Sequence, residues 1–347
     1  MTRVPAGASL PRAIDMPRRG VRIAGTGSAL PERVVTNHDL TQLMDTSDEW
    51  IQQRTGIRER RLCTPERGEG SVTLCTRALE NALANAHISA SDLDLLIIST
   101  VTGDMTCPSV SCRVAANVGA GSAGAFDLAA ACSGWVYGAN LAHDLIRLGT
   151  YNTIAVVGCD IMSSVLDFND RDRGLSILFG DAAGAAIIRA TDDATRGLLA
   201  SAMHADGERW TSLYIPHKVG DIPAGDETDV PMHRLVMRGR EVYKFAVTTF
   251  CNLIQQTLDQ AGLQASDIDM FICHQSNLRI IESARTRFGI PEDKVYVNID
   301  RVGNSSAGSV PLCLDELRQA GKCGEGDLVM FVAFGGGLTW ASALWRM

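Results

Sequence analysis

Short apolar runs alternate along this chain with longer stretches whose apolar residues recur every three to four positions. The short runs are bounded by glycine or polar residues, which is typical of buried β-strands. They lie at residues 21–27, 96–100, 153–158, 271–274 and 328–333. The periodic stretches predict amphipathic helices that pack on these strands; they lie at residues 76–87, 132–148, 253–263 and 306–321. The alternation predicts an α/β protein with mostly parallel sheets that are covered on both faces.

One hexapeptide occurs twice along the chain. Ala90-Ser-Asp-Leu-Asp-Leu95 returns 175 positions later as Ala265-Ser-Asp-Ile-Asp-Met270. A predicted helix precedes each copy and an apolar strand follows it, and later helices and strands recur at nearly the same offset. Because recurrence at one offset indicates internal duplication, we predict two pseudo-repeated halves, at residues 20–195 and 196–347.

Two segments carry no periodic pattern. Residues 1–19 contain three prolines and four arginines, with Asp15 as the single acid, and they predict a disordered N-terminal extension. A start at Met16 and a targeting peptide stay open as alternatives. Residues 203–235 contain prolines, histidines and aromatic residues without a period and predict a long loop or cap.

Composition excludes several classes of function. The net charge of −8 argues against nucleic acid as a general partner. No apolar run reaches the roughly 18 residues that a membrane span needs. The ten cysteines are scattered without a CxxC pair, so neither a zinc site nor a disulfide framework is indicated. We therefore expect a cytoplasmic protein without a metal.

Cys132 is the strongest candidate for a reactive side chain. It stands at the start of the predicted helix 132–148, where unpaired N–H groups and the helix dipole favour a thiolate and predict a lowered pKa. The same helix is expected to turn Asn140 and His143 to its polar face. The alternative interpretation of Cys132 is a packed core thiol, because free cysteines are commonly buried.

Two polar residues at element ends complete a candidate site. His274 ends the strand 271–274, and Asn304 stands in a small polar turn before the helix 306–321. Loops at the carboxyl ends of equivalent strands gather on one face, so both side chains can meet Cys132. An imidazole and a carboxamide can donate hydrogen bonds to a carbonyl oxygen and stabilise an enolate. The glycines of residues 335–337 let the backbone approach closely and offer N–H groups beside that of Cys132.

Several motifs together resemble the β-ketoacyl-acyl carrier protein synthase III family of the thiolase superfamily. The resemblance runs from about residue 20 to residue 347 and is carried by motifs in a fixed order. They are Gly25-Thr-Gly-Ser, Thr46-Ser-Asp-Glu-Trp-Ile, Arg54-Thr-Gly-Ile-Arg, Asp127-Leu-Ala-Ala-Ala-Cys-Ser-Gly, Asp172-Arg-Gly, Phe179-Gly-Asp, His274-Gln-Ser-Asn-Leu-Arg-Ile, Gly303-Asn-Ser-Ser-Ala and Gly335-Gly-Gly.

The resemblance implies a thiolase-like five-layer αβαβα fold, a homodimer and a ping-pong decarboxylative Claisen condensation. Cys132 takes an acyl group from acyl-coenzyme A, which is a substrate rather than a cofactor. The N–H groups of Cys132 and Gly337 form the oxyanion hole. Malonyl-acyl carrier protein then enters, and His274 and Asn304 hold its enolate after decarboxylation.

The same resemblance implies two sets of binding residues. For coenzyme A these are Trp50 and Arg173 around the adenine, Arg54 at the nucleotide and Asn277 near the pantetheine arm. For the acidic carrier protein they are Lys244, Arg279, Arg285 and Arg287, which are otherwise ordinary solvated helix charges.

The chain departs from the family before Pro108, where many members carry an aromatic residue that limits the partner's acyl pocket. Cys107 stands there instead. A smaller side chain predicts a larger pocket and primers longer than acetyl.

Two other functions stay open. One is a related acyltransferase or condensing enzyme of secondary metabolism that uses another acceptor. The other, from a different class, is an acyl-binding or carrier-protein-binding subunit without catalysis, although such a subunit is expected to have lost Cys132, His274 or Asn304.

Overall fold

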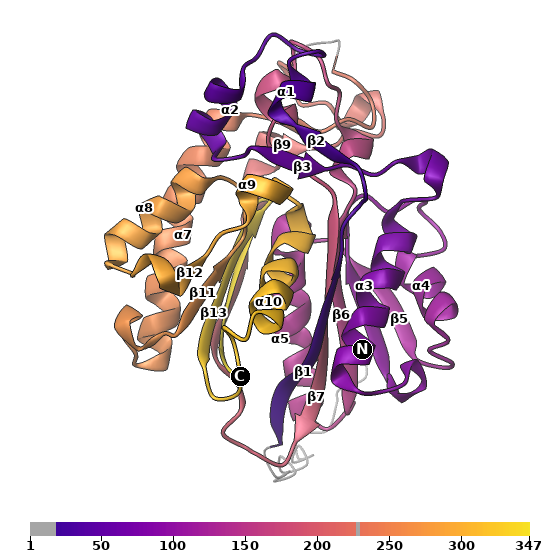
Figure 1. Cartoon of the computed structure of the whole chain (residues 1–347), viewed down its shortest axis with the longest axis vertical. Helices are drawn as coiled ribbons and strands as arrows, with labels where there is room; N and C mark the ends of the chain where they lie inside the picture. The colour runs from indigo at the N-terminus through magenta and orange to yellow at the C-terminus, as the bar shows by residue number, and fades with distance from the viewer. Residues whose placement is uncertain (1–18, 227–229) are drawn as a thin grey trace, which may run out of the picture.

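Two five-stranded sheets form the framework of the protein in a computed structural model, which describes residues 19–226 and 230–347 (Figure 1). The first sheet has the order β1-β7-β6-β4-β5. Its strands are β1 (Gly20–Ala29), β4 (Leu95–Ser99), β5 (Gly124–Leu128), β6 (Thr153–Asp160) and β7 (Ala182–Thr191). The second sheet has the order β12-β11-β13-β14-β8. Its strands are β8 (Gly197–Ala205), β11 (Met270–Cys273), β12 (Val295–Tyr296), β13 (Leu328–Gly335) and β14 (Thr339–Arg346).

Helices cover both sheets and also fill the space between them. The outer helices α3 (Ser71–Ala86) and α4 (Val110–Val118) pack on the first sheet, and α7 (Gly239–Ala261) and α8 (Leu278–Phe288) pack on the second. The central helices α5 (Gly134–Arg147) and α10 (Ser309–Gln319) share one hydrophobic core with strands of both sheets. The result is the five-layer αβαβα arrangement, so the predicted fold class is confirmed.

The two sheets repeat one plan. Strands β1, β4, β5, β6 and β7 hold the same places in the first sheet as β8, β11, β12, β13 and β14 hold in the second. The two hexapeptide copies form equivalent 3₁₀ turns, η2 (Ala90–Asp92) and η7 (Ala265–Asp267). The chain passes from one sheet to the other between Thr191 and Gly197.

The prediction of mostly parallel sheets was wrong, because each sheet is mixed. Strand β4 pairs in parallel with β5 and β6, but β6–β7 and β7–β1 are antiparallel, and the second sheet repeats this pattern. Only residues 336–338 join β13 to β14. A connection this short allows a hairpin and not a crossover, so β14 must run antiparallel to β13.

The predicted polar face of helix 132–148 was wrong for Asn140 and His143. Both are buried, because α5 packs between strands of the two sheets, whereas Asp144 on the same helix is exposed. Asn140 donates from Nδ2 to the carbonyl oxygen of Ser342 at 3.1 Å, which pairs one end of the amide inside the core.

Smaller elements form a cap over one end of the sheets, at the top of Figure 1. They are β2 (Val34–Thr36), α1 (Asn37–Leu40), α2 (Asp48–Thr55), β3 (Glu59–Arg61), α6 (Arg173–Ser176), β9 (Leu213–Tyr214), β10 (Val236–Met237) and α9 (Ile299–Val302). Most of residues 206–226 and 230–235 is irregular, as expected for a loop or cap. The buried Arg60 donates to the side chain of Asn37 and the carbonyl of Ile177, which ties the cap together.

Two sequence predictions concern the N-terminus and membrane-spanning helices. The predicted N-terminal extension lies almost entirely outside the described residues, which begin at Arg19. Across 19–226 and 230–347, no helix is both long and apolar enough to cross a membrane.

Candidate active site

Cys132 lies in a tight turn between β5 and α5. The turn is the 3₁₀ segment η3 (Ala131–Ser133), in which Ala131 has a φ of 46°. Gly335, at the end of β13, packs so closely against this turn that an added Cβ would lie 2.6 Å from the backbone nitrogen of Cys132. A glycine is therefore required at position 335 for the turn to hold the thiol where it is.

His274 follows β11 and is buried with 1% of its surface exposed. Its Nδ1 atom lies 2.7 Å from Oγ of Ser309, and its ring meets the edge of Phe334 at a centroid distance of 5.5 Å. These contacts fix the ring and leave Nε2 as the nitrogen that is not engaged by Ser309. Burial lowers the pKa of His274 to about 3, so the imidazole is neutral at physiological pH.

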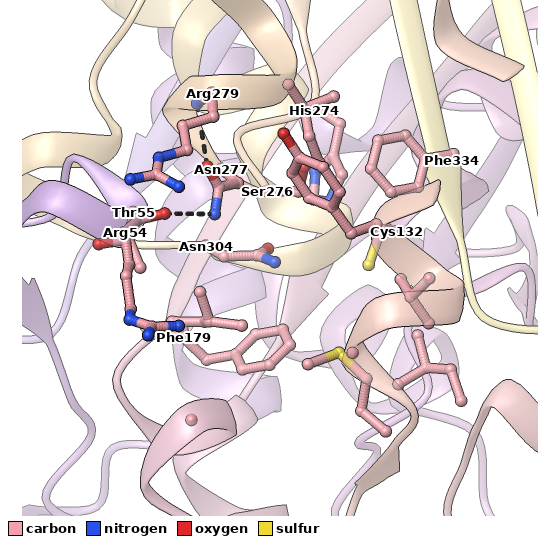
Figure 2. Close-up of a pocket in the computed structure, with 18 of the residues that line it drawn as sticks. Arg54, Thr55, Cys132, Phe179, His274, Ser276, Asn277, Arg279, Asn304 and Phe334 are labelled. Atoms are coloured by element: carbon pink, nitrogen blue, oxygen red, sulfur yellow. Dashed lines mark hydrogen bonds between the residues drawn. The ribbon is translucent and has the colours of Figure 1, made fainter. Parts of the chain in front are cut away.

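Asn304 approaches the same region from the loop before α10. Its Oδ1 atom accepts a hydrogen bond from the backbone N–H of Ser306 at 2.9 Å, so its NH₂ group is the end left for the pocket. The backbone of Asn304 bonds to Leu178 and Gly180, which anchors the loop to the cap. Figure 2 shows the carboxamide of Asn304 turned toward Cys132 and His274.

One cavity of about 330 Å³ brings the three side chains together. Cys132, His274 and Asn304 all line it. Other lining residues extend it outward along the cap and the outer helices; they include Trp50, Arg54, Tyr243, Asn277 and Arg279. Figure 2 places Arg54 and Cys132 on opposite sides of this space. The arrangement can hold a long thioester with its carbonyl at the three polar groups.

The predicted lowering of the Cys132 pKa was wrong. Burial raises the pKa of Cys132 to about 12, and the nearby carboxylate of Asp160 acts in the same direction. The helix start that favours a thiolate is thus outweighed by the loss of water around the sulfur. The thiol is neutral at physiological pH, so its proton must leave during any attack by the sulfur.

Two of the predicted coenzyme A residues, Arg54 and Arg173, lie against a third, Trp50 in α2. The guanidinium carbon of Arg54 lies 4.4 Å from the Trp50 ring centre, and that of Arg173 lies 5.4 Å from it. Arg173 also pairs with Asp45 at 3.2 Å. A base stacked between the Trp50 ring and the Arg173 guanidinium needs a gap of about two stacking distances, which is wider than the observed 5.4 Å. The Arg173 side chain must therefore turn aside to admit the base.

Asn277 caps helix α8 and joins it to the cap. Its Oδ1 accepts from the N–H of Arg279 at 2.9 Å, and its Nδ2 donates to the carbonyl of Arg54 at 3.0 Å (Figure 2). Asn277 therefore shapes the cavity wall with both ends of its amide already bonded.

The four residues predicted to meet a carrier protein do not form one cluster at the cavity. Arg279 lines the cavity and donates to the carbonyl of Gln53. Arg285 and Arg287 lie at the other end of α8, and Arg285 pairs with Glu282 at 2.7 Å. Lys244, on α7, lines a separate surface groove together with Arg209 and acidic residues.

A second cavity of about 460 Å³ lies on the other side of Cys132. Its walls include Cys132, Met162, Phe179, Ile215 and Gly337. Gly337 has a φ of 130°, a conformation that favours glycine. Cys107 is exposed and is not among the lining residues that the described chain gives this cavity.

Sequence reasoning assigned no role to three residues beside the catalytic candidates. Ser306 Oγ lies 3.2 Å from Cys132 Sγ and 2.5 Å from Oδ2 of Asp160. Ser309 contacts His274, as described above. Asp160 could have been found from the sequence, because it directly follows the apolar run of a buried strand, where a carboxylate is unusual. The two serines gave no separate signal within the Gly303-Asn-Ser-Ser-Ala motif.

The described residues, 19–226 and 230–347, contain no group of three or more His, Cys, Asp or Glu that could hold a metal ion. All ten cysteines fall within these ranges and are free.

Comparisons with known proteins agree with this geometry. The family model described as 3-oxoacyl-[acyl-carrier-protein] synthase III matches residues 126–207, and the model of its C-terminal part matches residues 258–347. The chain is 44% identical to β-ketoacyl-[acyl-carrier-protein] synthase III of Caldanaerobacter subterraneus, over 93% of this chain and 96% of the relative. It is also 44% identical to that of Symbiobacterium thermophilum, over 94% and 98% of the two chains.

Two solved structures are similar throughout. The β-ketoacyl-[acyl-carrier-protein] synthase III of Thermus thermophilus has a TM-score of 0.87 and 40% identity, with 94% of this chain and 98% of that chain covered. The priming β-ketosynthase of the R1128 polyketide biosynthetic pathway has a TM-score of 0.87 and 35% identity, with coverage of 96% and 98%.

Proposed function

The chain belongs to the 3-oxoacyl-[acyl-carrier-protein] synthase III family, and we propose that it joins an acyl-coenzyme A primer to malonyl-acyl carrier protein through an acyl-Cys132 intermediate. The protein is an acyltransferase that performs the initiating condensation of fatty acid synthesis. The observation that carries the role of Cys132 is its meeting with His274 and Asn304 in one cavity.

In the first half-reaction, Cys132 attacks the thioester carbon of the primer. Two backbone N–H groups, of Cys132 and of Gly337, stabilise the oxygen of the tetrahedral intermediate. Both residues line the second cavity, which supports placing the primer carbonyl between them. Coenzyme A then leaves, and the acyl group stays on the sulfur.

In the second half-reaction, His274 and Asn304 bind the thioester carbonyl of malonyl-acyl carrier protein. As carbon dioxide leaves, their hydrogen bonds hold the enolate, whose carbon attacks the acyl-Cys132 carbonyl. The NH₂ group of Asn304 is left for the pocket by its Oδ1 contact to Ser306, which suits it to this role. Each such donor is typically worth about 3 kcal/mol of the barrier.

The substrate arms enter past the cap. Trp50, Arg54 and Arg173 hold the nucleotide of coenzyme A, with Arg173 turning from Asp45 onto the base, and Asn277 shapes the path of the pantetheine arm. Arg279 is the cation best placed for the carrier protein, since it lines the cavity itself. The other three cations lie farther from the cavity; they are Lys244, Arg285 and Arg287. They contact the acidic carrier protein only if it covers a larger area of this surface.

We place the primer's acyl chain in the second cavity and expect chains longer than acetyl. The cavity volume of about 460 Å³ far exceeds the needs of an acetyl group. In a dimer, Cys107 of the partner subunit closes this cavity with a small side chain, so it leaves room where an aromatic residue does not.

A homodimer formed through strand β5 completes the proposal. Strand β5 is the edge of the first sheet, and exposed apolar side chains lie on and near it; they are Val101, Met105 and Phe126. An exposed apolar edge strand is suited to pairing with a second copy. The ten free cysteines suit a cytoplasmic location.

Mass spectrometry of the intact protein after incubation with acyl-coenzyme A tests this function. We expect one acyl mass on the peptide that contains Cys132, and none in Cys132→Ser, because an alcohol at its ordinary pKa is a weak nucleophile. No covalent acyl mass on the wild-type protein favours the alternative of a binding subunit.

The similarity to the R1128 priming ketosynthase makes a condensing enzyme of secondary metabolism the second candidate. Offering the acylated protein malonyl groups on different carrier proteins separates the two. Condensation only with a carrier of secondary metabolism would transfer the proposal to that branch.

A further inference from the structure

Ser306 connects the nucleophile to a buried carboxylate. Its Oγ atom lies 3.2 Å from Cys132 Sγ and 2.5 Å from Asp160 Oδ2. Ser306 has one hydroxyl hydrogen, and an ionised carboxylate can only accept. When the shorter contact takes the hydroxyl hydrogen, Ser306 Oγ keeps a lone pair that can accept the S–H proton of Cys132. Ser306 has a φ of 49°, so its backbone is held in a conformation that serine rarely adopts.

Asp160 is held by hydrogen-bond donors alone. It ends β6 with 0% of its surface exposed. Its Oδ1 accepts from the N–H of Val101 at 2.8 Å and from the hydroxyls of Thr100 and Thr102, and its Oδ2 also accepts from the N–H of Ala307 at 3.3 Å. Within the described chain no Lys, Arg or His nitrogen pairs with it. Burial without a counter-charge raises the pKa of Asp160. A raised pKa makes the carboxylate a better proton acceptor.

His274 is poorly suited to take the thiol proton. Burial lowers its pKa to about 3, so the doubly protonated ring is strongly disfavoured. The role proposed for His274 needs the ring hydrogen on Nε2, which is the tautomer in which Nδ1 accepts from Ser309. In that tautomer Nε2 has no lone pair for the thiol.

Other titratable groups line the two cavities that meet at Cys132. Tyr243, Arg54 and Arg279 line the first cavity, and Tyr214, His217 and His233 line the second. The carboxylate of Asp160 raises the pKa of Cys132, as a negative charge near a thiol does.

We propose that Ser306 and Asp160 form a proton relay for Cys132, and that Asp160 stores the thiol proton between the two half-reactions. This inference rests on the proposed condensation. Ser306 touches the reacting sulfur, whereas Asp160 acts through Ser306.

The proton balance closes over the cycle. As the sulfur bonds to the primer carbonyl carbon, the S–H proton passes to Ser306 and the Ser306 proton passes to Asp160. The tetrahedral intermediate breaks its bond to coenzyme A, whose thiolate takes a proton from solvent. In the second half-reaction the enolate carbon bonds to the acyl carbon, and the Cys132 thiolate leaves. Asp160 then returns its proton through Ser306, which restores the thiol.

The test compares two properties of Asp160→Asn that a relay moves in opposite directions. The amide removes the negative charge and can donate to Ser306 Oγ, which turns the serine hydrogen toward the sulfur and stabilises the thiolate. We expect the pH profile for alkylation by iodoacetamide, followed on the peptide containing Cys132, to move to lower pH. Acyl loading from acyl-coenzyme A at neutral pH should nevertheless fall about 100-fold, because its proton acceptor is lost.

Asp181→Asn is the matched control. Asp181 is also 0% exposed and also accepts a 2.5 Å hydrogen bond from a serine, Ser163, but neither residue contacts Cys132. The Asp181→Asn variant should leave the alkylation profile in place.

Ser306→Gly removes the relay hydroxyl at a φ that glycine tolerates. This variant should slow loading to a similar extent, even if Asp160→Asn does not fold. The double variant should load no more slowly than the slower single variant.

Unchanged loading in both Asp160→Asn and Ser306→Gly would overturn the relay, as would an equal alkylation shift in Asp181→Asn. A wild-type protein that loads no acyl group refutes the proposed condensation instead. The alkylation profiles then still report whether Asp160 controls the thiol.

Discussion

The Nδ1 atom of His274 and the Oγ atom of Ser309 lie 2.7 Å apart in the buried wall of the active-site cavity. Ser309 Oγ also lies 2.9 Å from the carbonyl oxygen of Ser306. The carbonyl oxygen can only accept the single hydroxyl hydrogen of Ser309, whereas Nδ1 can accept that hydrogen or donate its own to Oγ, so Ser309 couples the tautomer of His274 to this loop. Ser309 therefore bears on the role proposed for His274.

Ser309→Ala should slow decarboxylation of malonyl-acyl carrier protein roughly tenfold, because losing one hydrogen bond frees the tautomer and tilt of His274. Acyl loading on Cys132 should change little. Release of labelled carbon dioxide and intact mass measure the two steps separately. Ser305→Ala is the control, since Ser305 Oγ is buried in the same loop with no partner among the described residues. Equal losses in both serine variants contradict the role of Ser309.

The pH dependence of folding should reveal the neutral state of His274. Its pKa is about 3 in the folded protein, against an ordinary histidine value of 6.5, so the unfolded chain binds the proton more tightly. The stability that comes with the neutral ring is therefore complete above pH 6.5 and is lost as the pH falls from 6.5 toward 3. Urea unfolding of the wild type and His274→Asn across that window checks this, and the variant should lose less stability on acidification.

Gly335→Ala should reduce acyl loading by about 100-fold or more, because the new Cβ would displace the turn that carries Cys132. Gly336→Ala is the matched control. At Gly336 a Cβ would meet Leu213 at 3.5 Å, which is ordinary contact. Loading rates by intact mass should separate these neighbours, and similar behaviour of the two would show that the close approach at Gly335 is unimportant.

Trp50→Ala and Arg173→Ala should each raise the KM for acyl-coenzyme A about tenfold with little change in kcat, as expected for lost binding that is equal in ground and transition states. The stacking contacts around Trp50 support this. The KM for malonyl-acyl carrier protein serves as an internal control and should stay near its wild-type value. A fall in kcat alone counts against nucleotide binding by these residues.

Cys107→Phe should shorten the preferred primer, because a large ring would occupy part of the space proposed for the acyl chain. Cys107→Ser keeps a small side chain and should preserve the wild-type preference. Competition among acyl-coenzyme A primers of increasing length measures both profiles. If the Phe variant keeps the same profile, Cys107 does not limit the pocket.

Local pattern was sufficient for much of the architecture. The repeated Ala90 and Ala265 hexapeptides marked the duplication, and the apolar runs marked the buried strands, because hydrophobic period is a property of neighbouring residues. The first part of α7 was missed: the helix begins at Gly239 rather than near residue 253. Its first turns are mostly exposed, although Phe245, Ala246 and Phe250 are buried.

By itself the sequence determined which side chains are candidates for the chemistry: a cysteine at a turn before a helix, a histidine after a strand and an asparagine in a glycine turn. Only the tertiary structure decided their protonation. Cys132 keeps its proton, because the surrounding sheets remove water from the sulfur and bring Asp160 within one hydroxyl of it. Desolvation and charges from distant segments set a pKa, and neither can be read from the residues adjacent in sequence.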